Sequence, residues 1–233
     1  MSVIVGTSGY SYKEWKGIFY PPDLPAAKML SFYAEHFGTV EINNTFYRMP
    51  EAKTLEKWAG EVPDGFTFVI KAPQRITHQK RLDGVDEDVR HLVDVCSLLG
   101  PKLGPFLFQL PPYFRRDVGK LRHLLSLVPQ GRRVAFEVRN DTWLVEETYD
   151  VLAAHDAALC LADTDEVPDP DALIVRTASW GYLRLRRLEY TDDELMGWKE
   201  RIAAQGWTDT YLFFKHEDEA RGPAFARRFL ALR

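Results

Sequence analysis

Charged side chains recur at the ends of short β-branched and aromatic runs in this sequence. The pattern appears in Val40-Glu41-Ile42-Asn43, Phe68-Val69-Ile70-Lys71, Phe136-Glu137-Val138-Arg139, Leu183-Arg184-Leu185-Arg186 and Leu212-Phe213-Phe214-Lys215. Strand side chains alternate between two faces, so each run is expected to place its polar members on one face. Gln109 and Asp163 end two further runs. Carboxylates, amines and guanidinium groups collected in this way indicate acid–base chemistry or ion binding.

Cations outnumber carboxylates in this predicted cluster. Lys71, Arg139, Arg184, Arg186 and Lys215 stand against Glu41, Glu137 and Asp163, although the whole chain carries a net charge of −4. A recess with excess positive charge predicts a bound anion, such as a phosphate or carboxylate, which arginine holds through two hydrogen bonds. The structural alternative is that acids and bases pair across neighbouring strands without any ligand.

The reaction predicted for such a site is proton exchange with a small phosphorylated or otherwise anionic substrate, by a hydrolase, lyase or isomerase. A histidine such as His78 titrates near neutral pH, with a solvated or capping role in its loop as the alternative. Lys71 between carboxylates is most simply a salt-bridged cation, and the alternative is that neighbouring cations lower its pKa toward the range of a general base. Covalent acyl chemistry is not expected, because neither Ser8 nor a cysteine has a histidine partner in sequence. The candidate catalytic residues are Glu41, Lys71, His78, Glu137 and Asp163. The candidate substrate-binding residues are Ser8, Tyr10, Asn43, Tyr47, Arg48, Gln109, Arg139, Arg184, Arg186 and Lys215.

No cofactor is predicted, and Mg²⁺ or Mn²⁺ is the alternative. Glu41, Glu137, Asp163 and His78 come from separate runs and include the hard oxygen ligands that these ions prefer. The surrounding cations compete for the same carboxylates, and the chain has no HxH or HExxH motif.

The elements that must position these residues alternate regularly between short runs and helical segments. The predicted strands are 3–5, 39–43, 66–71, 103–110, 133–139, 158–162, 182–186 and 210–215. Helical spacing is found in 30–37, 55–58, 86–99, 118–128, 145–154, a segment that begins at Thr191, and 224–230. Asp86 is the predicted cap of the third of these helices, and Gly100 ends it. Thr191 and Glu194 form a predicted capping box for the sixth. No helix is expected in the loop that contains Pro168 and Pro170.

Eight strands alternating with helices predict an α/β fold with a parallel sheet, a (β/α)₈ TIM-type barrel forming one domain over residues 1–233. Such barrels typically take about 250 residues, so this one is lean. The alternative is a doubly wound open sheet, whose usual Gly-x-Gly-x-x-Gly and Walker signatures are absent. In a barrel, the polar residues at the strand ends would meet at the catalytic face.

Composition excludes several other classes. Hydrophobic residues make up 45% and charged residues 27%, which is typical of a globular protein and not of a disordered or fibrous one. No apolar run has the ~18 residues of a membrane span, and we expect no signal peptide and a cytoplasmic location. Cys96 and Cys160 are interpreted as small buried hydrophobic residues.

Five motifs resemble the YecE-like family, also called the domain of unknown function 72 family. They are Gly6-Thr7-Ser8-Gly9-Tyr10 with Trp15 and Phe19-Tyr20-Pro21; residues 40–48, Val-Glu-Ile-Asn-Asn-Thr-Phe-Tyr-Arg; residues 68–73 with Ile76-Thr77-His78; residues 104–112; and Phe136-Glu137-Val138-Arg139 with Trp143. The resemblance implies a TIM-type barrel and no particular reaction. The sequence departs from the family where Arg186-Arg187 replaces His-Gly and where Lys215-His216 replaces Asn-Asn. Both departures make the predicted site more basic.

Two other functions remain open. A nucleic-acid-binding or processing protein would use Arg48, Arg75, Lys80 and Arg81 on phosphates and stack bases on rim aromatics. These aromatics are Tyr10, Tyr12, Trp15, Phe19, Tyr20, Phe46, Tyr47 and Tyr113, for which loop packing is the alternative role. A non-catalytic ligand-binding module is the third function. The predicted partner is a small anion, with no membrane and no obligate protein partner. Binding to nucleic acid should weaken steeply with salt, and binding of a small anion in a buried site less so.

Overall fold

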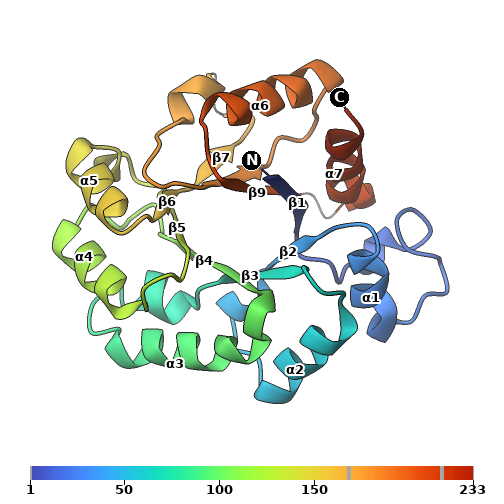
Figure 1. Cartoon of the computed structure of the whole chain (residues 1–233), viewed down its shortest axis with the longest axis horizontal. Helices are drawn as coiled ribbons and strands as arrows, with labels where there is room; N and C mark the ends of the chain where they lie inside the picture. The colour runs from blue at the N-terminus through green and yellow to red at the C-terminus, as the bar shows by residue number, and fades with distance from the viewer. Residues whose placement is uncertain (1, 167–168, 216–217, 233) are drawn as a thin grey trace.

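Parallel strands form a ring, and helices surround it on the outside (Figure 1). The computed structural model describes residues 2–166, 169–215 and 218–232. The strands are β1 (Ser2–Ser8), β2 (Thr39–Ile42), β3 (Thr67–Lys71), β4 (Leu103–Gln109), β5 (Val134–Glu137), β6 (Ala158–Leu159), β7 (Leu161–Asp163), β8 (Gly181–Leu185) and β9 (Asp209–Phe214). The helices are α1 (Met29–Ala34), α2 (Ala52–Glu61), α3 (Asp86–Cys96), α4 (Val118–Leu127), α5 (Glu146–Ala154), α6 (Asp192–Ala204) and α7 (Arg221–Ala231).

The sixth predicted strand is divided, and this division completes the ring. The strand order is β6-β5-β4-β3-β2-β1-β9-β8-β7, with every neighbouring pair parallel. β6 pairs with β5 and β7 pairs with β8, while only Cys160 separates β6 from β7 along the chain. The Cys160 amide donates to Phe136 O at 2.8 Å. The predicted TIM-type barrel is therefore confirmed, with its sixth strand in two pieces.

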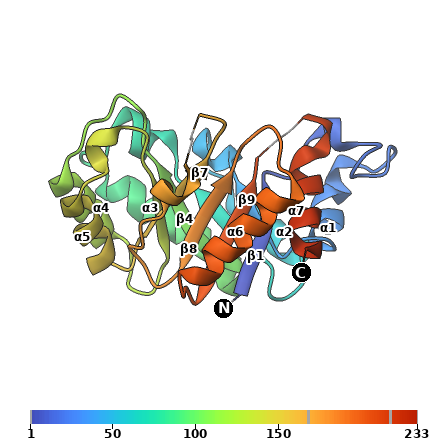
Figure 2. The ribbon, with the colours of Figure 1, turned by 90° about the horizontal axis from the view of Figure 1, so that it is seen from above.

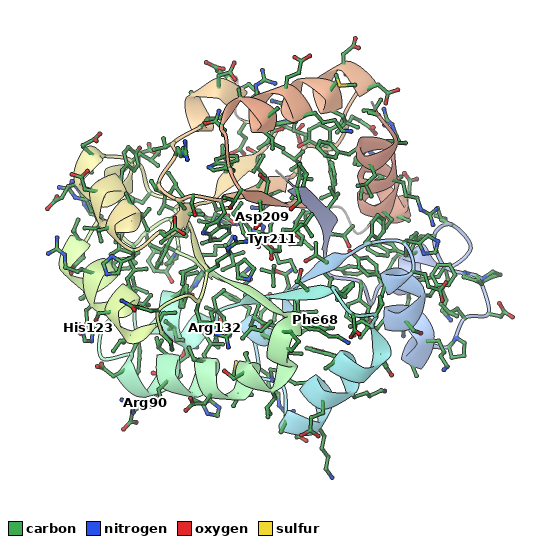
Figure 3. All side chains as sticks on the ribbon, viewed as in Figure 1. Phe68, Arg90, His123, Arg132, Asp209 and Tyr211 are labelled. Atoms are coloured by element: carbon green, nitrogen blue, oxygen red, sulfur yellow. The ribbon has the colours of Figure 1, made fainter. Side chains whose placement is uncertain are left out.

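The two faces of the strands divide the interior of the barrel from the layer under the helices. Buried residues of the barrel interior form one apolar cluster: Val69, Leu107, Ala135, Ala158, Cys160, Ala178, Trp180, Tyr182, Tyr211 and Phe213. Intervening residues such as Val40, Ile42 and Ile70 belong to the larger cluster under the helices. In Figure 3, Tyr211 lies inside the ring, whereas Phe68 lies toward α2, where it stacks on Trp58. The strand alternation expected from the sequence is thus realised.

The strands run side by side and tilted across the molecule, with helices on both sides in the edge-on view (Figure 2). Because all the strands are parallel, their carboxyl ends share one end of the barrel. The polar residues predicted for the site follow the apolar interior cluster along each strand. They are therefore collected at this end, which we call the barrel mouth.

One N-terminal helix cap predicted from the sequence is confirmed, and another is wrong. Thr191 and Glu194 form the predicted capping box of α6. Asp86 is the first residue of α3 and not its cap, because Val85 occupies the N-cap position and the Asp86 carboxylate instead lies 3.1 Å from His123 Nε2. α3 ends at Cys96, and the chain continues in tighter 3₁₀ turns to Lys102, within which Gly100 has a positive φ of 58°.

The segment between β7 and β8 contains only the short 3₁₀ helix η7 (Pro170–Leu173) among its described residues, and no α-helix, as expected. Pro168 and His216 lie outside the described residues. None of the described helices is long and apolar enough to cross a membrane. Cys96 and Cys160 are both free and buried, as predicted.

Candidate functional site

A chain of buried charges spans the barrel mouth. The Arg184 side chain is 2% exposed and donates to Glu41 Oε1 at 2.8 Å through Nη2, and to the Glu137 carboxylate through Nη1. Glu41 is fully buried and also accepts from Ser8 Oγ at 2.9 Å and from the Tyr182 hydroxyl at 2.6 Å. β1, β2, β5 and β8 each contribute to this network, so residues distant in sequence are fixed in one layer.

Glu137 is held as a carboxylate by a set of donors. Gln109 Nε2 at 2.7 Å, Arg139 Nε at 3.0 Å and Arg186 Nη1 at 3.3 Å all donate to Oε1. Burial opposes ionisation of Glu137, but the charges of Arg184, Arg139 and Arg186 outweigh it and hold its pKa well below the usual range. The ionised form of Glu137 is thus favoured near neutral pH, and its hydrogen bonds position three arginines.

Arg184 retains one donor without a partner. Burial alone would lower the pKa of this guanidinium, yet Glu41 and Glu137 raise it well above its ordinary value. Its Nε is buried and has no hydrogen-bond partner among the residues that the structure describes. The side chain also contributes to the wall of a cavity above the network. Arg184 is thus a fixed cation with hydrogen-bonding capacity to spare.

The cavity above this network has a volume of about 590 Å³ and a cationic wall. Five of its lining residues are cations, namely Lys71, Arg139, Arg184, Arg186 and Lys215. The remaining lining residues are Tyr12, Asn43, Asn44, Phe46, Tyr47, Gln74, His78 and Gln109. Among the described residues, no carboxylate lines it. Glu41 and Glu137 lie behind the wall, where they bond to the arginines. We call this space the cationic cavity.

Lys71 occupies the carboxyl end of β3, and its ammonium lies 4.3 Å from the centre of the Phe46 ring. None of the ion pairs that Glu41 and Glu137 form within the described part of the chain includes Lys71. Burial and the charge of Arg184 lower the pKa of Lys71 to about 8, against the opposing influence of the two glutamates. An appreciable fraction of this amine is therefore neutral at physiological pH.

His78 lies in the single π-helical turn η4 (Arg75–Gln79), which follows β3. π turns recur at functional sites because they redirect side chains. The imidazole packs edge-on against Phe46 at 4.9 Å, and its Nδ1 lies 2.8 Å from Thr77 Oγ1. Burial, and then the charges of Lys71 and Arg139, lower the pKa of His78. The ring is thus favoured in its neutral form beside the cavity.

A second hollow of about 780 Å³ adjoins the cationic cavity. Arg139, Arg186 and Lys215 line both spaces. The second hollow also contains Glu137, Ala162, Thr164, Asp165 and Glu166. The sequence departs from the resembled family at Arg186 and Lys215, and both place a cation at the junction.

Asp163 does not join this site. Cys160 belongs to the barrel interior and Leu161 to the outer core, so the alternation places Asp163 outward. Its carboxylate accepts from Arg187 Nε at 2.8 Å, Tyr190 OH at 2.9 Å and Trp198 Nε1 at 3.2 Å. The predicted catalytic role of Asp163 is replaced by an anchor between β7 and α6.

Three predicted substrate-binding residues also lie outside the cationic cavity. Arg48 is highly exposed beside a different recess, and its guanidinium lies 3.5 Å from Glu51. Tyr10 packs toward Tyr33 and borders a separate small recess, and burial raises its pKa to about 12. Ser8 is 3% exposed behind Glu41. Asn43, Tyr47, Gln109, Arg139, Arg184, Arg186 and Lys215 line the cavity as a group.

The structure does not bring the four candidate metal ligands together. Asp163 faces α6, and the oxygens of Glu41 and Glu137 are bonded to arginines. Within the described ranges, no group of three or more His, Cys, Asp or Glu residues is arranged to hold a metal ion. The donor set required by the Mg²⁺ or Mn²⁺ alternative is not assembled here.

The aromatic and basic rim is largely occupied by internal contacts. Trp15, Phe19 and Tyr20 are buried, and of the eight aromatics only Tyr47 and Tyr113 are exposed. Asp88 lies 2.7 Å from Arg75 and 2.6 Å from Lys80. The residues proposed for stacking bases and holding phosphates are therefore mostly engaged within the protein.

Two site residues were missed in the sequence. Tyr182 precedes Arg184 by two positions on the same strand face, so the alternation rule could have identified it as a partner for a buried acid. Phe46, counted only as a rim aromatic, contacts both Lys71 and His78. Its role depends on the path of the 3₁₀ turn η3 (Asn44–Phe46), for which the sequence carries no periodic signal.

The fold and the cavity define a TIM-type barrel protein, a parallel ring with charged residues lining a cavity at its carboxyl end. Comparison with known proteins identifies the family to which the chain belongs. The family model described as "Protein of unknown function DUF72" matches residues 4–233, so the chain belongs to the DUF72 family.

Relatives in this family support the assignment. The chain is 25% identical to the UPF0759 protein YunF of Bacillus subtilis strain 168, over 93% of this chain and 79% of that protein. It is 30% identical to the UPF0759 protein YecE of Escherichia coli K12 over 59% of this chain, a match that spans 48% of YecE. The crystal structure of a DUF72 family protein from Thermotoga maritima MSB8 superimposes with a TM-score of 0.84 at 27% identity, covering 99% of both chains. A DUF72 family protein from Enterococcus faecalis V583, with a TM-score of 0.79 at 18% identity over 99% of this chain and 96% of that one, shares the fold.

Proposed function

We propose that the protein is an enzyme that binds a small anionic substrate in the cationic cavity and exchanges protons with it through Lys71 and His78. The observation that carries the proposal is the wall of this cavity, where five cations meet with no lining carboxylate among the described residues. A cationic recess closed on one side by protein favours an anion more strongly than an exposed patch does, because water screens its charges less.

The two glutamates support this function from behind the wall. Glu41 and Glu137 hold Arg184 between them, so its guanidinium does not need to be ordered when a ligand binds. Preorganised donors lose less conformational freedom on binding and stabilise charge more effectively. Arg139 and Arg186 are attached to Glu137 in the same way. Phosphate and carboxylate groups both match this set of guanidinium donors.

Lys71 and His78 are the groups suited to move protons. Both have a lowered pKa, both line the cavity, and both contact Phe46. A general base works best when its pKa is near the operating pH. Lys71, with a pKa of about 8, is close to that condition. The alternative of a non-catalytic anion-binding module would require the cations but not a lysine and a histidine adjusted in this way.

Sulfate is the probe that tests the proposal, because it does not titrate near pH 8. A bound anion should raise the pKa of Lys71, and a group with a pKa of about 8 should then take up roughly half a proton at pH 8. Calorimetric titration in two buffers of different ionisation enthalpy measures this uptake. We expect Lys71→Met to abolish it and to weaken binding about tenfold. Lys199→Met is the matched control, since Lys199 also lies over a phenyl ring, that of Phe229 at 5.1 Å, but on the outer layer of the barrel.

Two results would contradict the proposal. One is that sulfate does not bind, or binds as tightly to Lys71→Met as to the wild type. The other is binding without any proton uptake, which would leave a binding module. Steep weakening with added salt, together with affinity for oligonucleotides, would instead support the nucleic-acid alternative. The cytoplasmic location stays a prediction.

A further inference from the structure

We propose that the substrate is an anionic carbonyl compound, a 2-oxo acid or a phosphorylated aldehyde or ketone, and that Lys71 forms an imine with its carbonyl carbon. This inference rests on the proposed anion site and adds the chemical class of its substrate. It names a covalent step for which the sequence alone gave no indication.

The position of Lys71 is the first argument. It ends a rigid barrel strand, points into the cationic cavity, and rests against the Phe46 ring rather than a carboxylate. A structural lysine in a buried layer would be expected to pair with an acid, yet Glu41 and Glu137 give their ion pairs to arginines. Lys71 thus has no ion-pair partner within the described ranges of the chain, and an amine placed between a hydrophobic face and a cation has the environment that activates lysine as a nucleophile.

The groups around Lys71 favour the neutral amine. Arg184 on β8 and Arg139 beyond β5 oppose its charge, while Glu41 on β2 and Glu137 on β5 favour it, and burial decides the balance toward a lowered pKa. A lysine whose only role was to anchor an anion would function best when fully charged. The guanidinium groups of Arg139, Arg184 and Arg186 already supply permanent charge for that purpose. Lys71 is therefore the group in this wall best suited to attack a carbonyl carbon.

The step balances with the groups present. The lysine ammonium first gives one proton to the neutral imidazole of His78. The neutral Nζ then attacks the carbonyl carbon and forms a C–N bond, and the carbonyl electron pair moves to oxygen, which takes this proton from His78. The nitrogen gives one proton to the neutral imidazole of His78. His78 returns it to the hydroxyl group, which leaves as water as the C=N bond forms. Overall, the lysine ammonium and the carbonyl compound give a protonated imine and one water. The anionic group of the substrate stays with the arginines.

Reductive trapping tests this chemistry directly. Glyoxylate, a small anionic aldehyde, is added with cyanoborohydride, and the modified lysines are identified by peptide mass mapping. At pH 8 about half of Lys71 should be the free amine, whereas an ordinary lysine with a pKa near 10.4 is less than about 1% free. We expect Lys71 to be labelled at least about tenfold faster than Lys199. Its rate should rise up to about pH 8 and then level off.

Two controls separate anion binding from imine formation. Sulfate should protect Lys71 and leave Lys199 unaffected. Glycolaldehyde, which carries no anion, should keep only the preference that the free amine of Lys71 gives, so its ratio of Lys71 to Lys199 labelling should fall below that of glyoxylate. Lys71→Arg retains the charge but cannot form an imine, so it should bind sulfate and give no adduct elsewhere in the cavity.

The outcomes distinguish the two proposals. Labelling spread over surface lysines, with Lys71 no faster than Lys199, would overturn the imine even if sulfate binds with proton uptake. Failure of sulfate to bind would overturn both. Labelling of Lys71 that sulfate does not prevent would show a reactive amine without an anion site, and would overturn the substrate class.

Discussion

Replacing Glu137 with glutamine tests the charge layer most directly. The carboxylate is 2% exposed and accepts hydrogen bonds from Gln109, Arg139, Arg184 and Arg186. In Glu137→Gln an NH2 group replaces one of the two accepting oxygens. This NH2 group must then face one of the four side chains that donate to Glu137 in the wild type. Of its ionic partners in the described part of the chain, Arg184 then keeps Glu41 alone, and its Nε has no hydrogen-bond partner there in the wild type.

Breaking a buried ion pair in this way costs about 3–5 kcal/mol of unfolding free energy. For a chain of this length each kcal/mol shifts the melting temperature by about 2–4 °C, so a fall of roughly 6–20 °C is expected. The effect should depend on pH. The pKa of Glu137 is lower in the folded than in the unfolded state, so its contribution is present above about pH 4.3 and is lost as pH falls. The difference from the wild type should shrink in acid.

Sulfate affinity is the second readout, and it moves in the opposite direction. Removing a unit negative charge about 10 Å from a bound sulfate, which carries two charges, strengthens binding by about 3 kcal/mol at an effective dielectric constant of 20, which is on the order of a hundredfold. Asp163→Asn is the matched control, because Asp163 is also fully buried and has three donors but faces α6. It should lose stability without a gain in sulfate affinity. If Glu137→Gln bound sulfate no more tightly than Asp163→Asn, the layer would be a structural ion-pair network and the anion site would be refuted.

Three further substitutions test separate parts of the structure. In the wild type, the pKa of Lys71 is lower in the folded than in the unfolded state, so the unfolded state binds more protons between about pH 8 and pH 10.4. The free energy of unfolding should therefore rise with pH in this range, by no more than about 3 kcal/mol. Urea titrations at several pH values should show that Lys71→Met lacks this rise. Tyr182→Phe removes the 2.6 Å hydrogen bond to Glu41 and should lower the free energy of unfolding by about 1.5–3 kcal/mol in the same assay. Calorimetry should find the sulfate affinity unchanged, because Tyr182 does not line the cationic cavity. Gly6→Ala would place a Cβ 2.2 Å from the Thr39 carbonyl oxygen on β2, so β1 and β2 would have to separate. The free energy of unfolding should fall by roughly 2–4 kcal/mol. A melting temperature equal to that of the wild type would show that the spacing between β1 and β2 is wrong.

The fold could be predicted because its strands and its helices each carry a periodic pattern of apolar residues in the sequence. Runs such as Val40–Asn43 alternate between an apolar outer face and a polar or small inner face, and the intervening helices have apolar residues at three- and four-residue steps. The division of the sixth strand at Cys160 could not be predicted, since it arises from how β5 and β8 pair with the same short segment. Cap positions such as Val85 also depend on tertiary contacts, here between Asp86 and His123.

The site could be predicted only where strand alternation determines which way a side chain points. This holds for Lys71, Arg139, Arg184, Arg186 and Lys215, which all reach the same cavity. Asp163 was assigned from its position at a strand end, without following the alternation from Cys160, and its carboxylate faces outward. Arg48 and Tyr10 lie in loops, where no periodicity fixes the direction of a side chain.

The hydrogen bonds also surround acids and bases differently from what residue types suggest. Glutamate is a common proton carrier in enzymes, but Glu41 and Glu137 receive more donors than they have oxygens, so their protonation would break a network that Arg184 holds together. Lys71 would ordinarily be a permanent cation, but the arginines have taken the available carboxylates and left its amine beside a phenyl ring. Permanent positive charge and a titratable amine are thus assigned to different side chains in one wall. That separation is what a site needs if it is to hold an anion and react with it at the same pH.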